Sequence, residues 1–339
     1  MKFDVVVGNP PYQESAKGES TKDTPIYPAF YDLAERVSDR YSLISPGRFL
    51  FNAGSTDKKW NDKMLSDPHL KVQFYEQDST AVFPGTDIKG GVAIIYRNVN
   101  SSYEPIGTFT VFDELNSILK KVVKRMDRGL DSIVSNRGQY RYSDAIYEDH
   151  PTLMKKISDR RIASNAFKNL PTIFCDGEKL NPELFVKMFG RVSNERLYKW
   201  IDKKYLSAPP NINSYKVVLP KANGSGVLGE ALSSPMVMPP GVGFTETFIS
   251  IGEFEKQEEA QNALIYIKSK FARLMLAILK ITQDNTSDKW RYVPLLDFSA
   301  SSDIDWSLPS KDVDRSLFVK FGLSENEIRF VEDKVKPME

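Results

Sequence analysis

The four residues Asn9-Pro10-Pro11-Tyr12 are the part of the sequence best suited to chemistry. Two adjacent prolines between an amide side chain and an aromatic ring occur by chance in about 1% of chains this long, given ordinary proline usage. They follow the short β-branched run 3–7, which predicts a buried strand. Because α/β folds bind ligands at the carboxyl ends of strands, this tetrapeptide is a candidate catalytic loop. The alternative is a proline-rich turn behind a core strand.

An asparagine oxygen and the backbone carbonyl after it can accept both hydrogens of an amino group. The exocyclic amine of adenine is a poor nucleophile because its lone pair is delocalised into the ring. Two acceptors draw the nitrogen toward tetrahedral geometry and free the lone pair to attack a sulfonium methyl group. Asn9 and the Pro10 carbonyl would supply the acceptors, and Pro11 would stiffen the loop because proline fixes φ. Tyr12 would stack on a base that has left the duplex, an interaction of about 1–3 kcal/mol in single-strand binding proteins.

The sequence has few residues suited to thiol, histidine or metal chemistry. Cys175 is the single cysteine, which excludes an internal disulfide and a cysteine-rich zinc site. We expect it to be a small, buried or half-buried side chain. The two histidines, His69 and His150, adjoin prolines in polar surroundings and are interpreted as surface residues. Glu332-Asp-Lys334 lacks the preceding Pro-Asp of a nuclease and is interpreted as a solvated helix face. No metal site is expected.

The elements that would position the loop alternate between helix and strand over the first hundred residues. Apolar spacing predicts helices over 28–38 and 60–65, and short apolar runs predict strands over 41–44, 70–75 and 92–96. This alternation implies an α/β fold, with a mostly parallel sheet and helices on its faces.

The rest of the chain is less regular. Residues 98–107 are polar and turn-rich, which predicts a domain boundary near residue 105. A helix is expected over 110–125 and a strand over 215–219, within a region from 133 to 240 whose topology we leave unassigned. An apolar stripe predicts one amphipathic helix over 256–280. Ser324-Glu-Asn-Glu327 is a capping box that predicts a last helix ending near residue 335.

Composition sets broad limits on the class of protein. The chain has 339 residues, of which 41% are hydrophobic and 27% charged, as in globular proteins of two or three domains. It has neither a signal-peptide pattern nor an apolar run long enough to cross a bilayer, so we expect a cytoplasmic protein. The net charge of +1 gives no support for a nucleic-acid partner, but a local basic cleft would suffice for one.

Beyond these inferences, the segment 2–13 resembles the catalytic motif of adenine-specific, amino-methylating DNA methyltransferases. Residues 41–50 and 82–96 are similar to the next conserved strands of that fold. The segments 269–283, 293–298, 303–306 and 323–328 are similar to the target-recognition region of restriction–modification methylases of type II or IIG. The resemblance is firm at both ends of the chain and looser over 110–225. It implies that residues 1–105 form the C-terminal half of the catalytic domain, on a partial Rossmann-like sheet, and that 106–339 form a mixed α/β target-recognition region.

The resemblance also implies a function and further site residues. The expected reaction is site-specific methyl transfer from S-adenosylmethionine to the exocyclic amine of adenine in double-stranded DNA. Phe83 would lie near the base pocket, unless it is simply a core aromatic. Arg137 and Arg141, in a loop of basic, amide and aromatic residues, are candidates to contact phosphates and base edges, with a solvated loop as the alternative. Lys268 and Arg273, on the basic flank of the 256–280 helix, are candidates for the DNA backbone or a solvated face.

One part of the family's pattern is missing. The family binds S-adenosylmethionine through a Gly-rich loop and an acidic residue upstream of the catalytic motif, and this sequence contains neither. Gly224-Ser-Gly226 and Gly241-Val-Gly243 are interpreted as plain loops. The cofactor-binding residues are therefore unassigned. We expect a split-gene product or a truncated piece that acts with an upstream-encoded methyltransferase or nuclease polypeptide.

Two alternatives stay open. The chain could be a non-catalytic DNA-specificity module of a restriction complex, which would bind no cofactor in isolation. It could also belong to a methyltransferase that acts on RNA or on protein glutamine, where related Asn-Pro-Pro-Tyr loops occur. The C-terminal similarity to target-recognition regions favours DNA over the second alternative.

Overall fold

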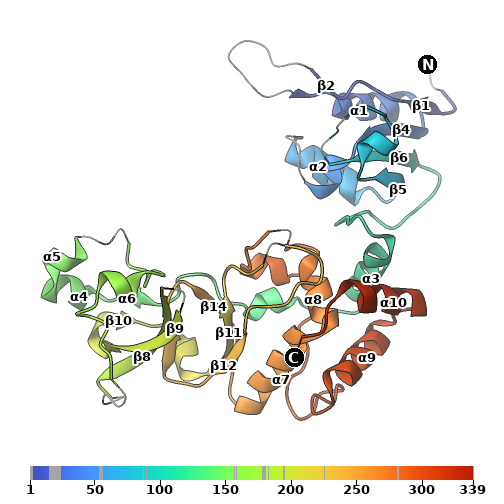
Figure 1. Cartoon of the computed structure of the whole chain (residues 1–339). Coiled ribbons are helices and arrows are strands. Elements are labelled where there is room, and N and C mark those ends of the chain that lie inside the picture. Colours follow the sequence, from blue (N-terminus) through green and yellow to red (C-terminus); the bar gives the residue numbers. More distant parts are fainter. Residues whose placement is uncertain are drawn as a thin grey trace. The chain divides into compact units, whose positions relative to one another are not determined.

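The chain folds into two compact units, Met1–Asn116 and Ser117–Glu339, each with its own hydrophobic core (Figure 1). The structure is a computed structural model. It describes residues 3–14, 24–52, 56–86, 88, 90–155, 157, 159–177, 181, 183–193, 195–224, 226–280 and 282–338. Within these ranges no helix is both long and apolar enough to span a membrane.

The first unit is built on a four-stranded sheet in the order β1-β4-β6-β5. β1 is parallel to β4, whereas β6 is antiparallel to both β4 and β5, so three strands share one direction. The expected parallel sheet is thus broken by β6, because only a short 3₁₀ turn, and no crossover helix, is described between β5 and β6. The strands are β1 Val6–Gly8, β4 Arg40–Pro46, β5 Leu70–Glu76 and β6 Val92–Asn98.

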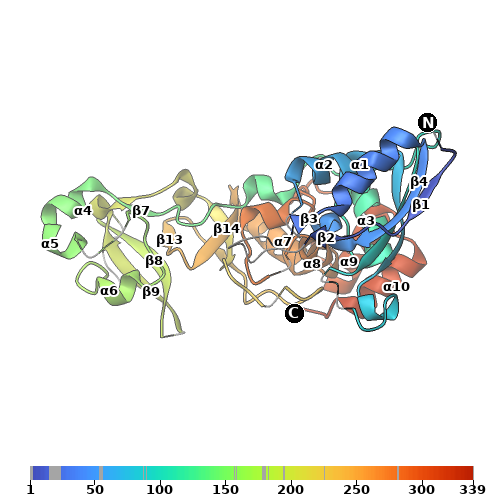
Figure 2. The ribbon, with the colours of Figure 1, turned by 90° about the horizontal axis from the view of Figure 1, so that it is seen from above.

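Aromatic side chains form the core of the first unit. Helix α1 (Tyr27–Val37) contributes Tyr31, whose ring lies 5.6 Å from that of Tyr41 on β4 and 5.8 Å from that of Trp60. Trp60 belongs to helix α2 (Lys58–Ser66), which begins where the Asp57 side chain accepts a hydrogen bond from the Trp60 amide, at 3.0 Å. Figure 2 shows α1 beside β1 and β4. Removing one such ring from a core costs about 3–5 kcal/mol, so this cluster holds the helices on the sheet.

Strand β1 lies at an edge of the sheet, and the expectation of a buried strand was wrong. Val5 is 48% exposed and Val7 74% exposed, while Val6 is half-buried against the core. Only β4 pairs with β1 among the described strands. Successive side chains of a strand point to opposite faces, so Val5 and Val7 lie on the face opposite the aromatic core.

The described residues of the second unit form three small sheets, which supply the topology that periodicity left unassigned. One has the order β12-β11-β14 and is antiparallel; another has the order β13-β8-β9, with β13 parallel to β8; the third pairs β10 with β7. The unit is therefore mixed α/β. The strands are β7 Arg141–Tyr142, β8 Phe185–Val192, β9 Glu195–Asp202, β10 Leu206–Ser207, β11 Tyr215–Pro220, β12 Met236–Met238, β13 Val242–Phe244 and β14 Phe248–Phe254.

Helices gather toward the C-terminus, and the single helix expected over 256–280 is in fact two. Ser269 has extended ψ (151°) and its side chain caps the second helix by accepting from the Ala272 amide at 3.0 Å, so the first helix ends there. The capping box at Ser324 is confirmed. The helices are α3 Asp113–Val123, α4 Asp144–Asp149, α5 Pro151–Met154, α6 Ala166–Asn169, α7 Gln257–Lys268, α8 Lys270–Ala277, α9 Ser310–Phe321 and α10 Glu325–Lys334.

A lysine is buried in the second unit. The Lys216 side chain on β11 is fully buried, and its Nζ donates to the carbonyls of Asn211, at 2.9 Å, and Ser214, at 3.1 Å. Burial lowers the pKa of Lys216 to about 8, although nearby Glu253 offsets part of the effect. The charged form is therefore less favourable in the folded protein than in the unfolded chain.

Because Lys216 is buried, the free energy of unfolding should be higher in mild alkali than at neutral pH. Between about pH 8 and 10.5 the unfolded chain keeps a proton on this lysine that the folded chain has lost, so the free energy of unfolding rises with pH. From pH 7.5 to 9.5 we expect a gain of about 2 kcal/mol over a Lys216→Met variant, measured by urea unfolding. The range ends below pH 10, where tyrosines begin to titrate in the unfolded chain. Parallel pH profiles of the two proteins would contradict the assignment.

Candidate functional site

Asn9-Pro10-Pro11-Tyr12 leaves the sheet at the carboxyl end of β1. Gly8, the last residue of β1, pairs with Leu43, and β4 continues for three residues beyond that point. Asn9 is exposed and Pro10 is buried, so the sheet holds the loop through the first proline and leaves the amide accessible. The loop is tied back to the start of α1, because the Tyr12 carbonyl accepts from the Ile26 amide at 3.1 Å.

Tyr12 is half-buried, and its hydroxyl makes no hydrogen bond among the described residues. Desolvation raises the pKa of this hydroxyl, and the nearby Asn9 side chain offsets part of the rise. The phenol is therefore neutral at physiological pH. A ring whose polar end is buried without a partner can pack against a ligand but has no evident role as an acid or base.

Arg48 and Gln13 are site residues that the sequence analysis did not identify. Arg48 lies in the 3₁₀ turn Gly47–Phe51 directly after β4, and its Nη2 donates to Gln13 Oε1 at 3.3 Å. Because β1 and β4 are parallel neighbours, the turns after them meet at one edge of the sheet. The signal in the sequence was Ser45-Pro46-Gly47-Arg48, a turn that follows a strand as the asparagine loop does.

Glycine is required where Arg48 approaches β6. Gly90 has φ +85°, and a Cβ atom there would lie 2.7 Å from the Arg48 Cβ. The backbone of the turn is also fixed, since the Gly47 amide donates to the Gly91 carbonyl at 2.9 Å. This close packing sets the position of the Arg48 backbone relative to the sheet.

Several buried polar atoms close to this loop have no hydrogen-bond partner among the described residues. They are the hydroxyl of Tyr12, which lies near the Asn9 side chain, the hydroxyls of Tyr27 and Thr56, which lie near each other, and the Arg48 Nε. Burial raises the pKa of Tyr27 to about 12, and Arg48 opposes that rise, which places the two side chains near each other. Buried polar atoms are nearly always paired in folded proteins, so this cluster is suited to water or to polar groups of a ligand.

Phe83 shares the edge of the sheet but not the immediate site. It lies after β5, where its amide donates to the Ser79 carbonyl at 2.8 Å, and its side chain is half-buried. In the sheet order, β5 is three strands from β1, a separation of about 14 Å at ordinary strand spacing. Among the described residues, no hydrogen bond or ring contact joins Phe83 to Tyr12.

Arg137 and Arg141 both lie in the second unit. Arg137 is half exposed and its Nε lies 2.7 Å from Glu246 Oε1, so it is paired rather than freely solvated. Arg141 is exposed on β7, in an isolated bridge with Arg161. Arg161 also reaches Glu246 Oε1, at 3.2 Å. The structure thus gathers Arg137 and Arg161 around one carboxylate, with Arg141 joined to Arg161 by a backbone bridge.

Arg273 was wrongly expected to face DNA. It is 2% exposed, and its guanidinium donates to the backbone carbonyls of Lys268, at 3.0 Å, Gly229, at 3.1 Å, and Lys336. A guanidinium saturated by buried carbonyls cannot contact a phosphate, because exposing it would leave those acceptors unpaired. Lys280 of the same supposed flank is also buried, paired with Glu230. Lys268 is half-buried and stays a candidate.

Three further expectations concern single residues. Cys175 is exposed, contrary to expectation, and its backbone forms an isolated bridge with Trp200. His69 and His150 are half-buried rather than free surface residues: His69 Nδ1 lies 2.8 Å from the Ser101 carbonyl, and His150 Nε2 lies 3.1 Å from the Tyr205 hydroxyl. None of the three has the surroundings of a catalytic group.

The glycine pairs form loops in the structure as well. The Gly226 amide donates to the Glu230 carboxylate, at 3.2 Å and 3.3 Å to its two oxygens, so the chain's own acid fills this turn. Gly241 precedes a strand, β13, and not a helix. Phosphate- and nucleotide-binding glycine loops open a helix, and neither segment does so.

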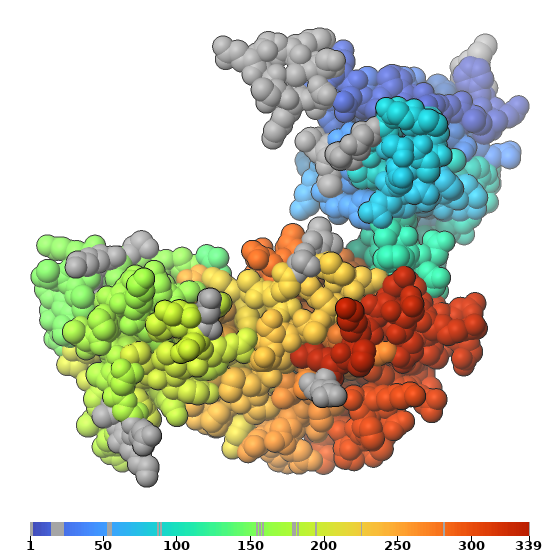
Figure 3. Space-filling model, viewed as in Figure 1, coloured from blue at the N-terminus to red at the C-terminus, as the bar shows by residue number. Residues whose placement is uncertain are grey.

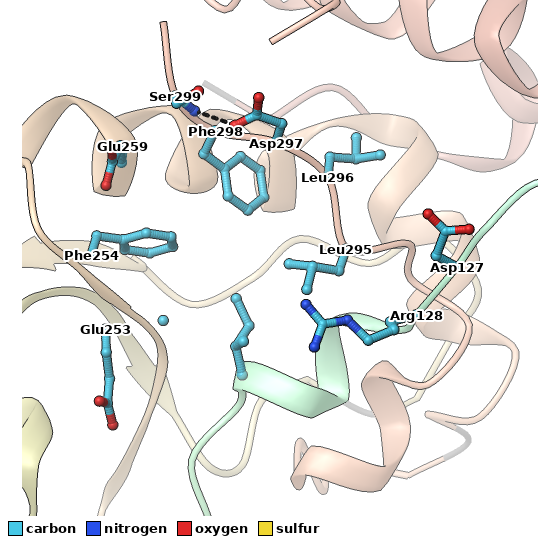
Figure 4. Close-up of a pocket in the computed structure, with 12 residues that line it drawn as sticks. Asp127, Arg128, Glu253, Phe254, Glu259, Leu295, Leu296, Asp297, Phe298 and Ser299 are labelled. Atoms are coloured by element: carbon cyan, nitrogen blue, oxygen red, sulfur yellow. Dashed lines mark hydrogen bonds between the residues drawn. The ribbon is translucent and has the colours of Figure 1, made fainter. Parts of the chain in front are cut away.

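One hollow of the second unit is acidic (Figure 4). Its volume is about 480 Å³, and apolar side chains such as Leu295 and Phe298 form part of its wall. Among the described residues that line it, Asp127, Glu253, Glu259 and Asp297 are acidic and Arg128 alone is basic. Such a surface repels a polyanion, so this hollow is not a candidate for nucleic acid.

Comparisons with known proteins support a methylase. Residues 1–83 match the Eco57I restriction-modification methylase family. An uncharacterised adenine-specific methylase of Mycoplasma pneumoniae is 27% identical over 170 residues, which are 47% of this chain and 38% of that protein. The resemblance to restriction–modification adenine methylases is thereby confirmed for the N-terminal segment, at modest identity.

Two solved structures of restriction enzymes are weakly similar. The type IIG restriction endonuclease BpuSI aligns at 10% identity and TM-score 0.34, over 93% of this chain and 48% of that chain. The type IIL restriction-modification enzyme MmeI, in complex with DNA, aligns at 11% identity and TM-score 0.33, over 98% of this chain and 56% of that chain. Likenesses this weak decide neither fold nor function. The chain spans about half the length of these two proteins and 38% of the curated relative.

Proposed function

We propose that this chain is the adenine-binding and DNA-reading portion of a site-specific adenine methyltransferase of a restriction–modification system. One observation carries the proposal: an exposed asparagine, held by a buried proline at the carboxyl end of a strand, within the segment that matches a methylase family. The substrate is double-stranded DNA and the product is adenine methylated on its exocyclic amine.

The first unit supports a partial Rossmann-like sheet. Three strands share one direction, and helices α1 and α2 cover one face through the aromatic core. The outer edge of β1 carries no described strand, and Val5 and Val7 beside it are exposed. We propose that cofactor-binding strands continue the sheet from this edge, which would pair the β1 backbone.

The residues of the loop act on the adenine amine. The Asn9 side-chain oxygen and the Pro10 carbonyl each accept one amine hydrogen, which localises the lone pair on nitrogen for attack. Pro10 contributes no amide hydrogen that would compete with the base, and its burial fixes where its carbonyl lies. The same two acceptors stabilise the positive charge that develops on the nitrogen during transfer, until one of the two amine hydrogens leaves as a proton.

Tyr12 and Arg48 hold the extruded base and its strand. The Tyr12 ring stacks on adenine, with its hydroxyl turned into the protein where it is buried. Arg48 is fixed by Gln13 and by the close packing of Gly90, so its cationic end lies beside the loop and favours a phosphate of the flipped nucleotide. Arg48 therefore positions the flipped nucleotide.

The chain's residues do not fit a complete S-adenosylmethionine site. Neither glycine pair opens a helix, and the amide of Gly226 is already engaged by Glu230. S-adenosylmethionine supplies an electrophilic methyl group when bound. We propose that residues outside these 339, on the polypeptide encoded upstream, hold it next to the Asn9 loop.

Target recognition is assigned to the second unit. Arg137 and Arg141 are proposed to contact DNA, and Lys268 is proposed to contact the DNA backbone. In the first unit, Phe83 is proposed to border the base pocket from the β5 end of the sheet edge, opposite β1. As an enzyme that acts on DNA, the protein is expected in the cytoplasm.

A non-catalytic specificity module is the second candidate, favoured by the absent cofactor loop. Methyl transfer separates the two. Tritiated methyl from S-adenosylmethionine is offered with unmethylated DNA to this chain, to the upstream-encoded polypeptide and to both together. We expect label in DNA only with both. Label from the chain alone would show that it holds its own cofactor site, and label from the upstream polypeptide alone would favour the specificity module.

A further inference from the structure

A basic hollow of about 400 Å³ lies in the second unit. Lys168 of α6, Arg191 at the end of β8 and Lys221 just after β11 line it, and none of the described residues in its wall is acidic. Ser164, Asn165 and Thr247 add hydroxyl and amide groups to the wall. The lining residues come from segments distant in the sequence, between residues 164 and 247, which the colour bar of Figure 3 places from green to orange-yellow.

More cations surround the hollow. Lys221 Nζ lies 3.6 Å from Glu246 Oε1, the same oxygen that Arg137 and Arg161 approach. Glu246 is largely buried, with 11% of its side chain exposed, so its single charge is shared among three cations. It therefore orients them without neutralising them. The carboxylates nearby are Asp159, which pairs with Arg161, Glu195, which lies opposite Val192 in the β8–β9 hairpin, and Asp284, which bridges to Ala222.

The hairpin end adds a crowded pair of guanidinium groups. Arg196 of β9 pairs with Arg191 across the hairpin, and its pKa is lowered first by burial and then by the charge of Arg191. Arg196 is held by the carbonyls of Ser233 and Ser234, both at 3.0 Å. Arg191 and Arg196 thus place two guanidinium groups at the end of the hairpin that lines the hollow.

These observations select one ligand chemistry. Lysine and arginine with hydroxyl and amide donors are the groups that bind backbone phosphates of nucleic acid. The acidic hollow lined by Asp127 and Glu253 excludes the same ligand from another part of the unit. We propose that the phosphate backbone of the DNA duplex binds in the hollow of Lys168, Arg191 and Lys221. This proposal rests on the proposed function and adds a site to it.

Phosphate contacts fix the register of a protein on DNA but carry no sequence information. The site therefore contributes affinity to any duplex, and base reading lies elsewhere on the chain. Its contribution follows counterion release, in which each neutralised phosphate adds about 0.9 to the slope of log K against log salt.

The test is the salt dependence of DNA binding by the full chain. A fluorescein-labelled 30-base-pair duplex of random sequence is titrated by anisotropy between about 50 and 200 mM NaCl, the range in which phosphate contacts change affinity strongly. The variant Lys168→Gln/Arg191→Gln/Lys221→Gln is compared with the control Lys311→Gln/Arg315→Gln/Lys336→Gln, which removes equal charge from exposed residues of α9 and the C-terminal segment.

We expect the slope to fall by about 3 in the hollow variant and affinity at 0.1 M salt to fall by about 10²-fold, with the control close to wild type. Lys168→Gln alone, at an exposed position on a short helix, should lower the slope by about 1 without affecting folding. Wild-type binding with an unchanged slope in the hollow variant overturns the site but leaves the proposed function standing.

Three further outcomes would each overturn a stated part of the proposal. Loss of affinity for one target sequence but not for random duplex would overturn the assignment to phosphate. Tighter binding of a matched RNA duplex, lost in the same variant, would overturn DNA as the ligand. If the wild-type chain, with and without its upstream partner, binds no duplex, the proposed function itself fails.

Discussion

Replacing Asn9 with alanine should lower the rate of methyl transfer at least about 10²-fold, with little effect on stability. The variant removes one of two acceptors that act where charge develops, and comparable losses in other enzymes are about 10²–10³-fold. Asn9 is exposed, so its removal leaves the core untouched. The measurement is single-turnover methyl transfer by the chain with its upstream partner, alongside urea unfolding of the same variant.

Two comparisons sharpen this test. Asn9→Asp keeps an oxygen acceptor and should retain more activity than Asn9→Ala. Asn100→Ala, at an exposed asparagine in the turn after β6, should match wild type. Equal activity of wild type and Asn9→Ala would remove the asparagine from the mechanism, and a large loss of stability in that variant would mean that its role is structural.

Tyr12 should be required for its ring and not for its hydroxyl. Loss of stacking in Tyr12→Ala should cost about 1–3 kcal/mol of base binding, which is about 5- to 150-fold in kcat/KM. Tyr12→Phe should stay within about twofold of wild type, because the buried hydroxyl makes no hydrogen bond among the described residues and the nearby Asn9 amide is exposed to water, which can satisfy it.

A fluorescent adenine analogue at the target position reports the same prediction independently. Emission of 2-aminopurine rises when the base leaves the stack, so Tyr12→Phe should show the wild-type rise and Tyr12→Ala a smaller one. If Tyr12→Phe loses as much activity as Tyr12→Ala, the hydroxyl takes part in the reaction. Because the pKa of that hydroxyl is raised by burial, such a role would be as a neutral donor.

Local patterns predicted the elements around the site well. The helices at α1 and α2 and the strands β4, β5 and β6 lie where apolar spacing placed them, since each buries one face against the aromatic core. The capping box of α10 was also found, because both of its hydrogen bonds are local in sequence. Such features need no knowledge of distant partners.

Features that depend on distant partners were missed. The run before Asn9 is apolar enough for a buried strand, yet β1 is an edge strand because only β4 pairs with it. Arg273 follows a basic periodicity, but the carbonyls of Gly229 and Lys336, remote in sequence, draw it into the interior. Arg48 meets Gln13 only because two parallel strands end together. The clustering of Arg137, Arg161 and Lys221 at Glu246 likewise has no signal in any one segment.

The most direct test of the account is the chemical identity of the methylated product. Unmethylated DNA is treated with the chain, its upstream partner and S-adenosylmethionine, then digested to nucleosides and analysed by mass spectrometry. The account predicts N6-methyladenine as the modified nucleoside, present with wild type and lost with Asn9→Ala. A methylated cytosine, or N6-methyladenine at equal yield with Asn9→Ala, would contradict it.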